Sequence, residues 1–140
     1  LAAESASPRA PLVTVYASTG CRCCARWSAH LRAAGFAVRT DHSQSLPQVR
    51  ARLGIPGRYA SCHTAVVDSY VVEGHVPASD IRRLLLARPE ARGLSVPGMP
   101  IGSPGMEGRS AKEYRVYLIS TAGKAEVFAR HIPQPSSVAD

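Results

Sequence analysis

The chain has 140 residues, which is long enough for one domain to build a hydrophobic core without disulfide bonds. It is 45% hydrophobic and 19% charged, and no apolar run reaches the roughly 20 residues that span a bilayer. The 17 basic residues exceed the 10 acidic ones, but the arginines are dispersed and accompany no nucleic-acid-binding motif. We therefore expect neither a membrane span nor a nucleic-acid partner.

The N-terminal residues 1–11 are rich in alanine, serine and proline and predict a flexible lead-in. Small residues of this kind surround signal-cleavage sites, so we expect an exported protein whose signal peptide has been removed. A single domain is predicted over residues 12–131, followed by a tail over residues 132–140.

Apolar patterning predicts alternating strands and helices in the first two thirds of the chain. Strands are expected at residues 12–16, 36–40, 64–67 and 70–73, and helices at residues 23–34, 46–53 and after an N-cap at Ser79. A parallel strand–helix–strand unit, then a hairpin and a closing helix, is the order of a thioredoxin-like α/β fold. The C-x-x-C of residues 21–24 lies at the strand-to-helix turn, where that fold keeps its redox pair.

The chain changes character after Pro89. Residues 93–108 contain three prolines, five glycines and both methionines, so we predict an irregular loop of functional importance. Two further strands, at residues 114–119 and 125–129, predict a C-terminal hairpin that adds to the sheet.

Three of the four cysteines, Cys21, Cys23 and Cys24, lie within four residues at the start of the first predicted helix. Unpaired N–H groups and the helix dipole favour thiolate there, and thiolate is the form that binds metals or attacks disulfides. Adjacent cysteines cannot both point into one core, so a purely structural role for Cys23 and Cys24 is disfavoured.

The fourth cysteine, Cys62, is followed at once by His63, directly before the third predicted strand. In a thioredoxin-like fold this position faces the C-x-x-C and normally carries a cis-proline. Four thiolates suit Zn²⁺ or Cu⁺, and the three-plus-one spacing fits a bridged Cu(I) cluster better than a zinc site made of two C-x₂-C knuckles.

Three other side chains are candidate ligands. Met99 and Met106 lie in the glycine- and proline-rich loop, and a thioether binds Cu(I) but not zinc, although both could equally be apolar packing residues. His75 could reach the site from the end of the fourth predicted strand or be a structural histidine. Glu73 and Glu107 have no visible pairing partner, and we predict no acid–base role for them.

With these residues in view, the chain resembles the family of CopG-like copper-resistance proteins, small exported bacterial proteins with a thioredoxin-like domain. The resemblance covers roughly residues 12–130. It rests on the combination of residues 21–27 (CRCCARW), 61–66 (SCHTAV), 71–77 (VVEGHVP), 91–94 (ARGL) and 96–107 (VPGMPIGSPGME).

The resemblance implies a periplasmic protein of copper resistance that binds Cu(I), as one ion or as a multinuclear cluster. It implies the ligands Cys21, Cys23, Cys24 and Cys62, with His63, His75, Met99 and Met106 as additional ligands or neighbours. Such a protein could pass copper to an export or delivery protein, or interconvert copper oxidation states as a copper oxidoreductase.

Two other interpretations stay open from the sequence. The first is a thiol–disulfide oxidoreductase that uses Cys21 and Cys24, although Cys23 would trap its mixed disulfides. The second is a structural zinc site.

Overall fold

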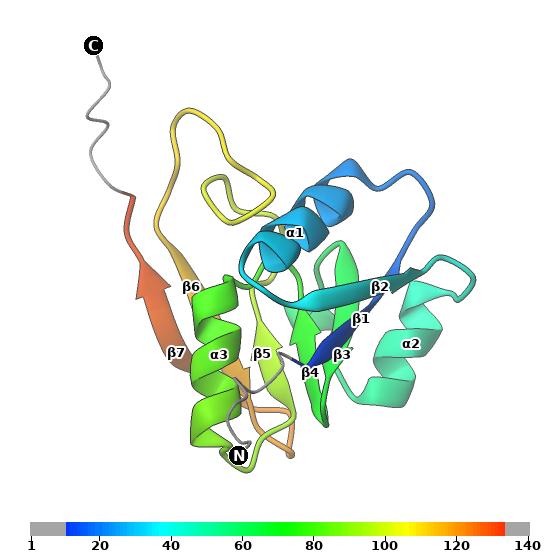
Figure 1. Cartoon of the computed structure of the whole chain (residues 1–140). Helices are drawn as coiled ribbons and strands as arrows, with labels where there is room; N and C mark the ends of the chain where they lie inside the picture. Colours follow the sequence, from blue (N-terminus) through cyan, green and yellow to red (C-terminus); the bar gives the residue numbers. More distant parts are fainter. Residues whose placement is uncertain (1–10, 134–140) are drawn as a thin grey trace, which may run out of the picture.

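A computed structural model describes residues 11–133 as an α/β fold with one seven-stranded sheet (Figure 1). Its elements are β1 (Leu12–Ala17), α1 (Arg22–Ala33), β2 (Ala37–Asp41), α2 (Leu46–Leu53), a 3₁₀ turn (Gly57–Tyr59), β3 (His63–Val67), β4 (Tyr70–Glu73), α3 (Ala78–Ala87), β5 (Gly93–Ser95), β6 (Tyr114–Ile119) and β7 (Ala125–His131). The predicted α/β class is confirmed. The lead-in predicted at 1–11 and the tail at 132–140 lie almost wholly outside the described residues.

The strand order in the sheet is β2-β1-β3-β4-β5-β6-β7. β1 runs parallel to β2 and antiparallel to β3, which in turn pairs antiparallel with β4. The predicted strand–helix–strand unit and the hairpin after it are therefore confirmed. The predicted C-terminal hairpin is also present as β6 and β7, and it extends the same sheet.

The prediction that residues 93–108 are wholly irregular is wrong at the start of that range. Gly93–Ser95 form β5, which lies parallel to β4 and antiparallel to β6 inside the sheet. A side chain at Gly93 would collide with the backbone of Val71, so glycine permits this close pairing. The strand is too short to show a period in the sequence, and only its long-range partners identify it.

The prediction that Ser79 caps the third helix is also wrong. α3 begins at Ala78, with Pro77 in the N-cap position and no side-chain cap. The free N–H of Ala78 instead donates to Nε2 of His30 on α1, at 3.0 Å. A tertiary contact therefore replaces the local cap at this helix N-terminus.

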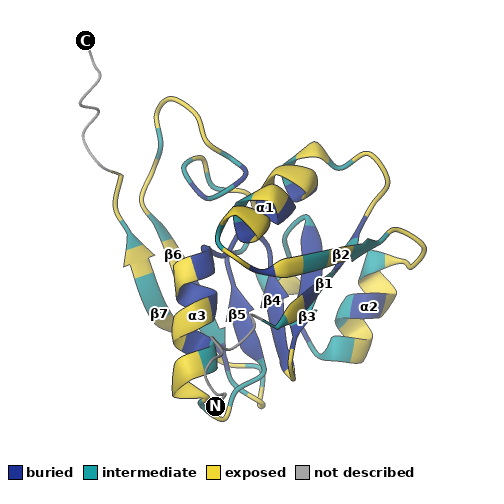
Figure 2. Cartoon of the chain, viewed as in Figure 1, coloured by how far each residue is buried: buried dark blue, intermediate teal, exposed yellow. Residues whose placement is uncertain are grey.

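One hydrophobic core joins the sheet to two of the helices. It includes Val13 and Val15 of β1, Trp27 of α1, and Ile81 and Leu84 of α3, all fully buried. α1 and α3 lie in front of the sheet in Figure 1, and Figure 2 shows that their outward faces are exposed while the central strands are buried. Because β1 ends at Ala17 and α1 begins at Arg22, the first turn of α1 lies close to the end of β1.

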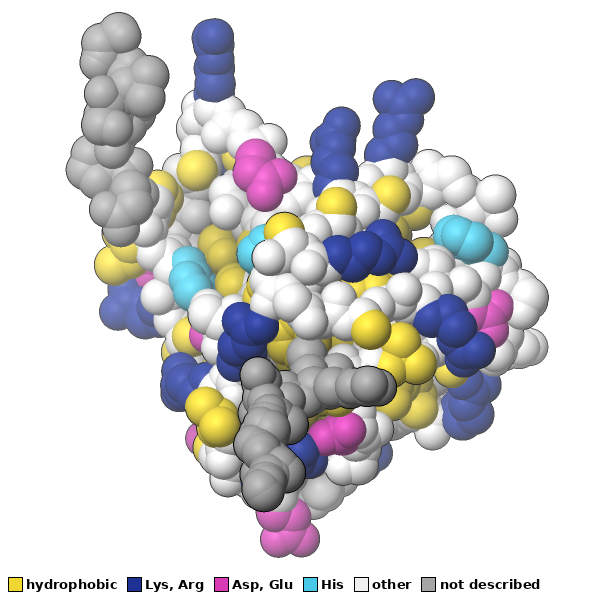
Figure 3. All heavy atoms as spheres, viewed as in Figure 1, with side chains coloured by type: hydrophobic (Ala, Val, Ile, Leu, Met, Phe, Trp, Pro, Cys, Tyr) yellow, Lys and Arg dark blue, Asp and Glu magenta, His cyan; other side chains and the backbone are white. Residues whose placement is uncertain are grey.

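In the part of the chain that the structure describes, no helix is long and apolar enough to cross a membrane. On the face seen in Figure 3, lysine and arginine side chains stand at separate points rather than in one patch. This agrees with the dispersed arginines in the sequence.

Candidate metal centre

The C-x-x-C segment opens α1 directly after the turn that follows β1. Cys21 occupies the N-cap position with an extended backbone, and its sulfur accepts a hydrogen bond from the N–H of Cys24 at 3.3 Å. Cys21 and Cys24 are joined by a disulfide bond. The structure thus contains the C-x-x-C pair in its oxidised state at a helix N-terminus.

Cys23 and Cys62 are free, half-buried thiols. Their sulfur atoms lie 3.4 Å apart, and Sγ of Cys23 lies 3.6 Å from Sγ of Cys21. All four cysteine sulfurs lie within 4.8 Å of one another, so they form a group that could hold a metal ion. The structure thus brings together all four predicted cysteines.

Sheet register explains why residues so distant in the sequence meet. β3 pairs antiparallel with β1, and His63 at its start lies opposite Ala17, the last residue of β1. Cys62 therefore lies beside the end of β1, from which the chain continues into Cys21 and α1. The expectation that Cys62 faces the C-x-x-C is confirmed.

A buried polar network holds the segment that carries Cys62. The carboxylate of Glu73 accepts hydrogen bonds from the backbone N–H of Ser61 (2.8 Å), the hydroxyl of Thr64 (2.5 Å) and Nε of Arg50 (2.7 Å). Arg50 also donates to the carbonyl of Ser61 at 2.6 Å. We call Arg50, Ser61, Thr64 and Glu73 the polar clamp, because two of its members flank Cys62 and His63 on either side.

The expectation that Glu73 lacks a partner is therefore wrong. Glu73 is fully buried and pairs with Arg50 of α2. Burial raises the pKa of Glu73, and the hydrogen bonds from Thr64, Ser61 and Arg50 act in the opposite direction. The available signal was a single glutamate at the end of an otherwise apolar strand, since such a residue seldom remains buried without a partner.

His75 is oriented toward Cys62 from the segment after β4. Its Nδ1 donates to the carbonyl of Pro104 at 2.5 Å, and its Nε2 lies 3.0 Å from Sγ of Cys62. A carbonyl only accepts hydrogen bonds, so Nδ1 carries the proton and Nε2 presents its lone pair to the sulfur. Metal-binding histidines commonly show this arrangement.

His63 lies on the other side of Cys62, with Nδ1 3.4 Å from its sulfur. The fully buried imidazole packs against Trp27 in a tilted arrangement, with 4.3 Å between ring centroids. Its Nε2 has no hydrogen-bond partner among residues 11–133. Burial lowers the pKa of His63 to about 3 and also lowers the pKa of His75. Both rings are thus neutral near pH 7, as metal binding requires.

The protonation state of Cys62 differs from that expected of a cysteine at a helix N-terminus. Cys62 lies outside the helix, and burial together with the neighbouring Cys23 raises the pKa of its thiol to about 12. In the absence of a metal it is a neutral thiol. A metal ion that bound there would therefore displace a proton.

The loop between β5 and β6 approaches the cysteines closely. Gly105 has a φ of +91°, and a Cβ at this position would lie 2.8 Å from Nδ1 of His75 and 2.9 Å from the carbonyl oxygen of Cys23. The thioether of Met99, half exposed, lies 3.8 Å from Sγ of Cys23. Met106 contributes backbone hydrogen bonds to Gly102 and Ser103 within the loop. Of the two methionines, Met99 is thus the one in contact with a cysteine sulfur.

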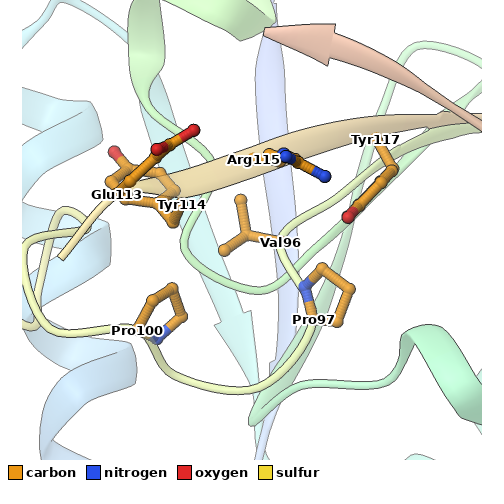
Figure 4. A pocket seen from close by; sticks show the side chains of 7 residues that line it. All are labelled: Val96, Pro97, Pro100, Glu113, Tyr114, Arg115 and Tyr117. Atoms are coloured by element: carbon orange, nitrogen blue, oxygen red, sulfur yellow. The ribbon is translucent and has the colours of Figure 1, made fainter. Parts of the chain in front are cut away.

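Two cavities lie near these elements. The larger, about 420 Å³, lies between β6 and the start of the loop, and its lining contains no cysteine, methionine or histidine (Figure 4). A smaller one, about 120 Å³, is lined by Cys21 and Cys24 together with Arg32 and His42. Of these two cavities, the smaller is the one that borders the disulfide.

The fold and the site together define a small α/β protein with sulfur and imidazole groups that could hold a metal ion. A family model described as "Protein of unknown function, DUF411" matches residues 59–106. Among curated proteins, none matches this chain.

Two solved structures resemble the chain along nearly its whole length. One, "Copper resistance protein copG- Form 1", shares 42% identity over 89% of this chain and 99% of its own, with a TM-score of 0.83. The other, Form 2 of a protein of the same name, shares 44% identity over 87% and 98%, with a TM-score of 0.81. This protein belongs to the CopG-like family of copper-resistance proteins.

Proposed function

We propose that this protein binds Cu(I) through Cys21, Cys23, Cys24 and Cys62 and acts in copper resistance. The observation that carries the proposal is the convergence of four cysteine sulfurs within 4.8 Å of one another. Soft thiolate ligands select Cu(I), and membership of a copper-resistance family favours copper over zinc.

In the proposed copper-loaded form the Cys21–Cys24 bond is reduced, so that all four sulfurs are available as thiolates. Thiolates can bridge metal ions, and four of them in so small a volume suit a cluster of several Cu(I) ions better than one. His63, His75 and Met99 lie near enough to complete the coordination or to support the ligands. Cu(I) binding by Cys62 would release its proton, so affinity should rise with pH.

The cellular setting is part of the same proposal. We place the protein in the periplasm, where a disulfide such as Cys21–Cys24 persists. The strand order β2-β1-β3-β4, with α1 after β1 and α3 after β4, supports a thioredoxin-like arrangement. The protein would pass copper to an export or delivery protein, or change the oxidation state of the bound copper.

A second candidate function is thiol–disulfide exchange through Cys21 and Cys24. The observation that favours it is the disulfide at the N-terminus of α1, beside a small cavity. Cys23 disfavours it, since its thiol lies 3.6 Å from Sγ of Cys21 and would capture mixed disulfides.

Anaerobic titration of the fully reduced protein with Cu(I), against a competing chelator, tests the proposal. We expect more than one copper ion per chain, thiolate-to-copper charge-transfer absorption, and a lower count for Cys62→Ser. His131→Gln is a matched control, because this half-exposed histidine on the edge strand β7 bonds to Asp80. Absence of copper binding, together with reduction of insulin disulfides, would establish the exchange activity instead.

A further inference from the structure

The disulfide divides the four cysteines into two pairs. Cys21 and Cys24 are bonded to each other and cannot act as thiolate ligands, whereas Cys23 and Cys62 remain free and adjacent. Three other donors touch this free pair, and the first is Nδ1 of His63, which lies 3.4 Å from Sγ of Cys62. Nε2 of His75 lies 3.0 Å from Sγ of Cys62, and Sδ of Met99 lies 3.8 Å from Sγ of Cys23.

We infer that Cys23, Cys62 and His75 form a site for a single Cu(I) ion that persists while Cys21 and Cys24 are disulfide-bonded, with Met99 as a weaker fourth donor. The inference rests on the proposed copper binding and adds a second state to it. The centre would hold several ions when reduced and one ion when oxidised.

The spacing of the donors supports this assignment. Ligands about 2.3 Å from a metal ion in trigonal geometry lie roughly 4 Å from one another. Sγ of Cys62 lies 3.4 Å from Sγ of Cys23 and 3.0 Å from Nε2 of His75, and Sδ of Met99 lies 3.8 Å from Sγ of Cys23. Cys62 is therefore the donor that contacts both the second thiol and the imidazole, and these side chains must move apart to admit an ion. Two thiolates, an imidazole and a thioether form a donor set suited to Cu(I).

The surroundings fix the imidazole of His75 in a ligating orientation. The carbonyl of Pro104 holds the proton on Nδ1, which leaves Nε2 free toward Cys62. Gly105 allows the loop to pack directly against the ring. None of these contacts involves Cys21 or Cys24 side chains, so opening or closing the disulfide leaves the orientation of His75 in place.

Formation of the Cys21–Cys24 disulfide would then release some of the bound copper ions. Closing the disulfide removes one electron from each of the metal-bound thiolates of Cys21 and Cys24. The two electrons pass to an oxidant of the disulfide or azo (diamide) class, which takes up two protons from solvent. The ion on Cys23 and Cys62 keeps both of its thiolates and its oxidation state. Ions that depend on Cys21 and Cys24 lose their ligands and become available to an acceptor.

The experiment compares two states of the same chain. The metal-free protein is oxidised with one equivalent of diamide, whose N=N group takes up the two electrons and two protons, and peptide mapping identifies the Cys21–Cys24 product. Both the oxidised and the reduced protein are then titrated anaerobically with Cu(I). We expect one ion per oxidised chain, with an X-ray absorption spectrum that contains sulfur and nitrogen ligands.

Two variants test the ligands. The double variant Cys21→Ser/Cys24→Ser should also bind one ion, without any oxidation step. In oxidised protein, His75→Gln should weaken Cu(I) binding about tenfold or more, whereas His131→Gln should leave it unchanged. A His75→Gln protein with unaltered affinity would remove histidine from the site and overturn the inference.

The outcomes separate this inference from the proposed function. Several ions on the reduced protein and none on either the oxidised protein or the double variant would refute the single-ion site alone. No binding by the reduced protein would refute the proposed function, and the single-ion site with it. The counts on unmutated protein decide both points even if His75→Gln fails to fold.

Discussion

The two segments that supply the cysteine sulfurs are held by different means. The triplet at the start of α1 is positioned locally, by a turn after β1, a sulfur N-cap and the helix itself. Cys62 precedes a strand, and the polar clamp between α2 and β4 fixes the backbone on either side of it. One half of the centre is therefore built from short-range interactions and the other from long-range ones.

This difference predicts that the two halves respond differently to substitution. A local helix start tolerates changes elsewhere, because its geometry is set within a few residues. The clamp depends on a fully buried carboxylate, and loss of a single partner leaves an uncompensated charge. The segment that carries Cys62 should thus be the more sensitive of the two to substitution.

The largest expected effect comes from Arg50→Met. Removal of the guanidinium leaves buried Glu73 without its ion pair and Ser61 without a donor, which should lower the free energy of unfolding by about 3–5 kcal/mol. Urea unfolding of the metal-free protein measures this. Arg88→Met is the matched control, because its ion pair with Asp68 is exposed and should contribute at most about 1 kcal/mol.

Equal effects of the two arginine variants would contradict the distinction between the halves. The number of Cu(I) ions bound by each variant gives a second test of this distinction. If the clamp positions Cys62, Arg50→Met protein that is still folded should bind fewer Cu(I) ions than Arg88→Met protein.

A smaller, pH-dependent effect tests the hydrogen bond that joins α1 to α3. Nε2 of His30 accepts from the N–H of Ala78, and burial lowers the pKa of His30 from its ordinary value of 6.5, against a smaller opposing effect of Glu107. Just below pH 6.5, His30 therefore binds a proton more readily in the unfolded chain than in the folded one. The stabilisation from the His30–Ala78 hydrogen bond is present above pH 6.5 and is lost as the pH falls through the folded-state pKa of His30.

The measurement is the free energy of unfolding of metal-free protein between pH 8 and pH 4. His30→Leu lacks both the acceptor and the titration, so its profile should fall less steeply below about pH 6.5, by roughly the 1 kcal/mol of one hydrogen bond. His63 and His75 titrate in both proteins and cancel in the difference. Parallel profiles would show that His30 does not fasten α1 to α3.

The smallest effect concerns the loop over the centre. Met99→Leu keeps the volume but removes the thioether in contact with Cys23, and should weaken Cu(I) binding a few-fold. Met106→Leu, in the same loop, should have no effect on affinity. Competition with a Cu(I) chelator distinguishes them, and equal affinities for both variants would make Met99 a packing residue.

The sequence predicted the local parts of this molecule well. Cys21 at a strand-to-helix turn, the βαβ unit and the hairpins all follow from patterns within a few residues of one another. The meeting of Cys62 with the triplet was predicted only through the expected fold, since no local pattern indicates that β3 lies beside β1.

The parts that escaped prediction depend on contacts between distant residues. β5 exists because Gly93 and its neighbours fit between β4 and β6, and the polar clamp exists because α2 brings Arg50 to a glutamate in β4. His75 could be read as either ligand or structural residue, because its orientation is set by Pro104, far along the chain. Pairings of this kind leave no periodic signature.

The close approach at Gly105 carries a consequence for how this protein can diverge. The loop rests on His75 and on the backbone of Cys23 through a residue without a side chain, so a methyl group there would push the loop away from both. Most loop positions can vary in evolution because insertions and substitutions are absorbed at the surface. Position 105 lacks this freedom, and relatives with a larger residue there would need a different lid over their cysteines.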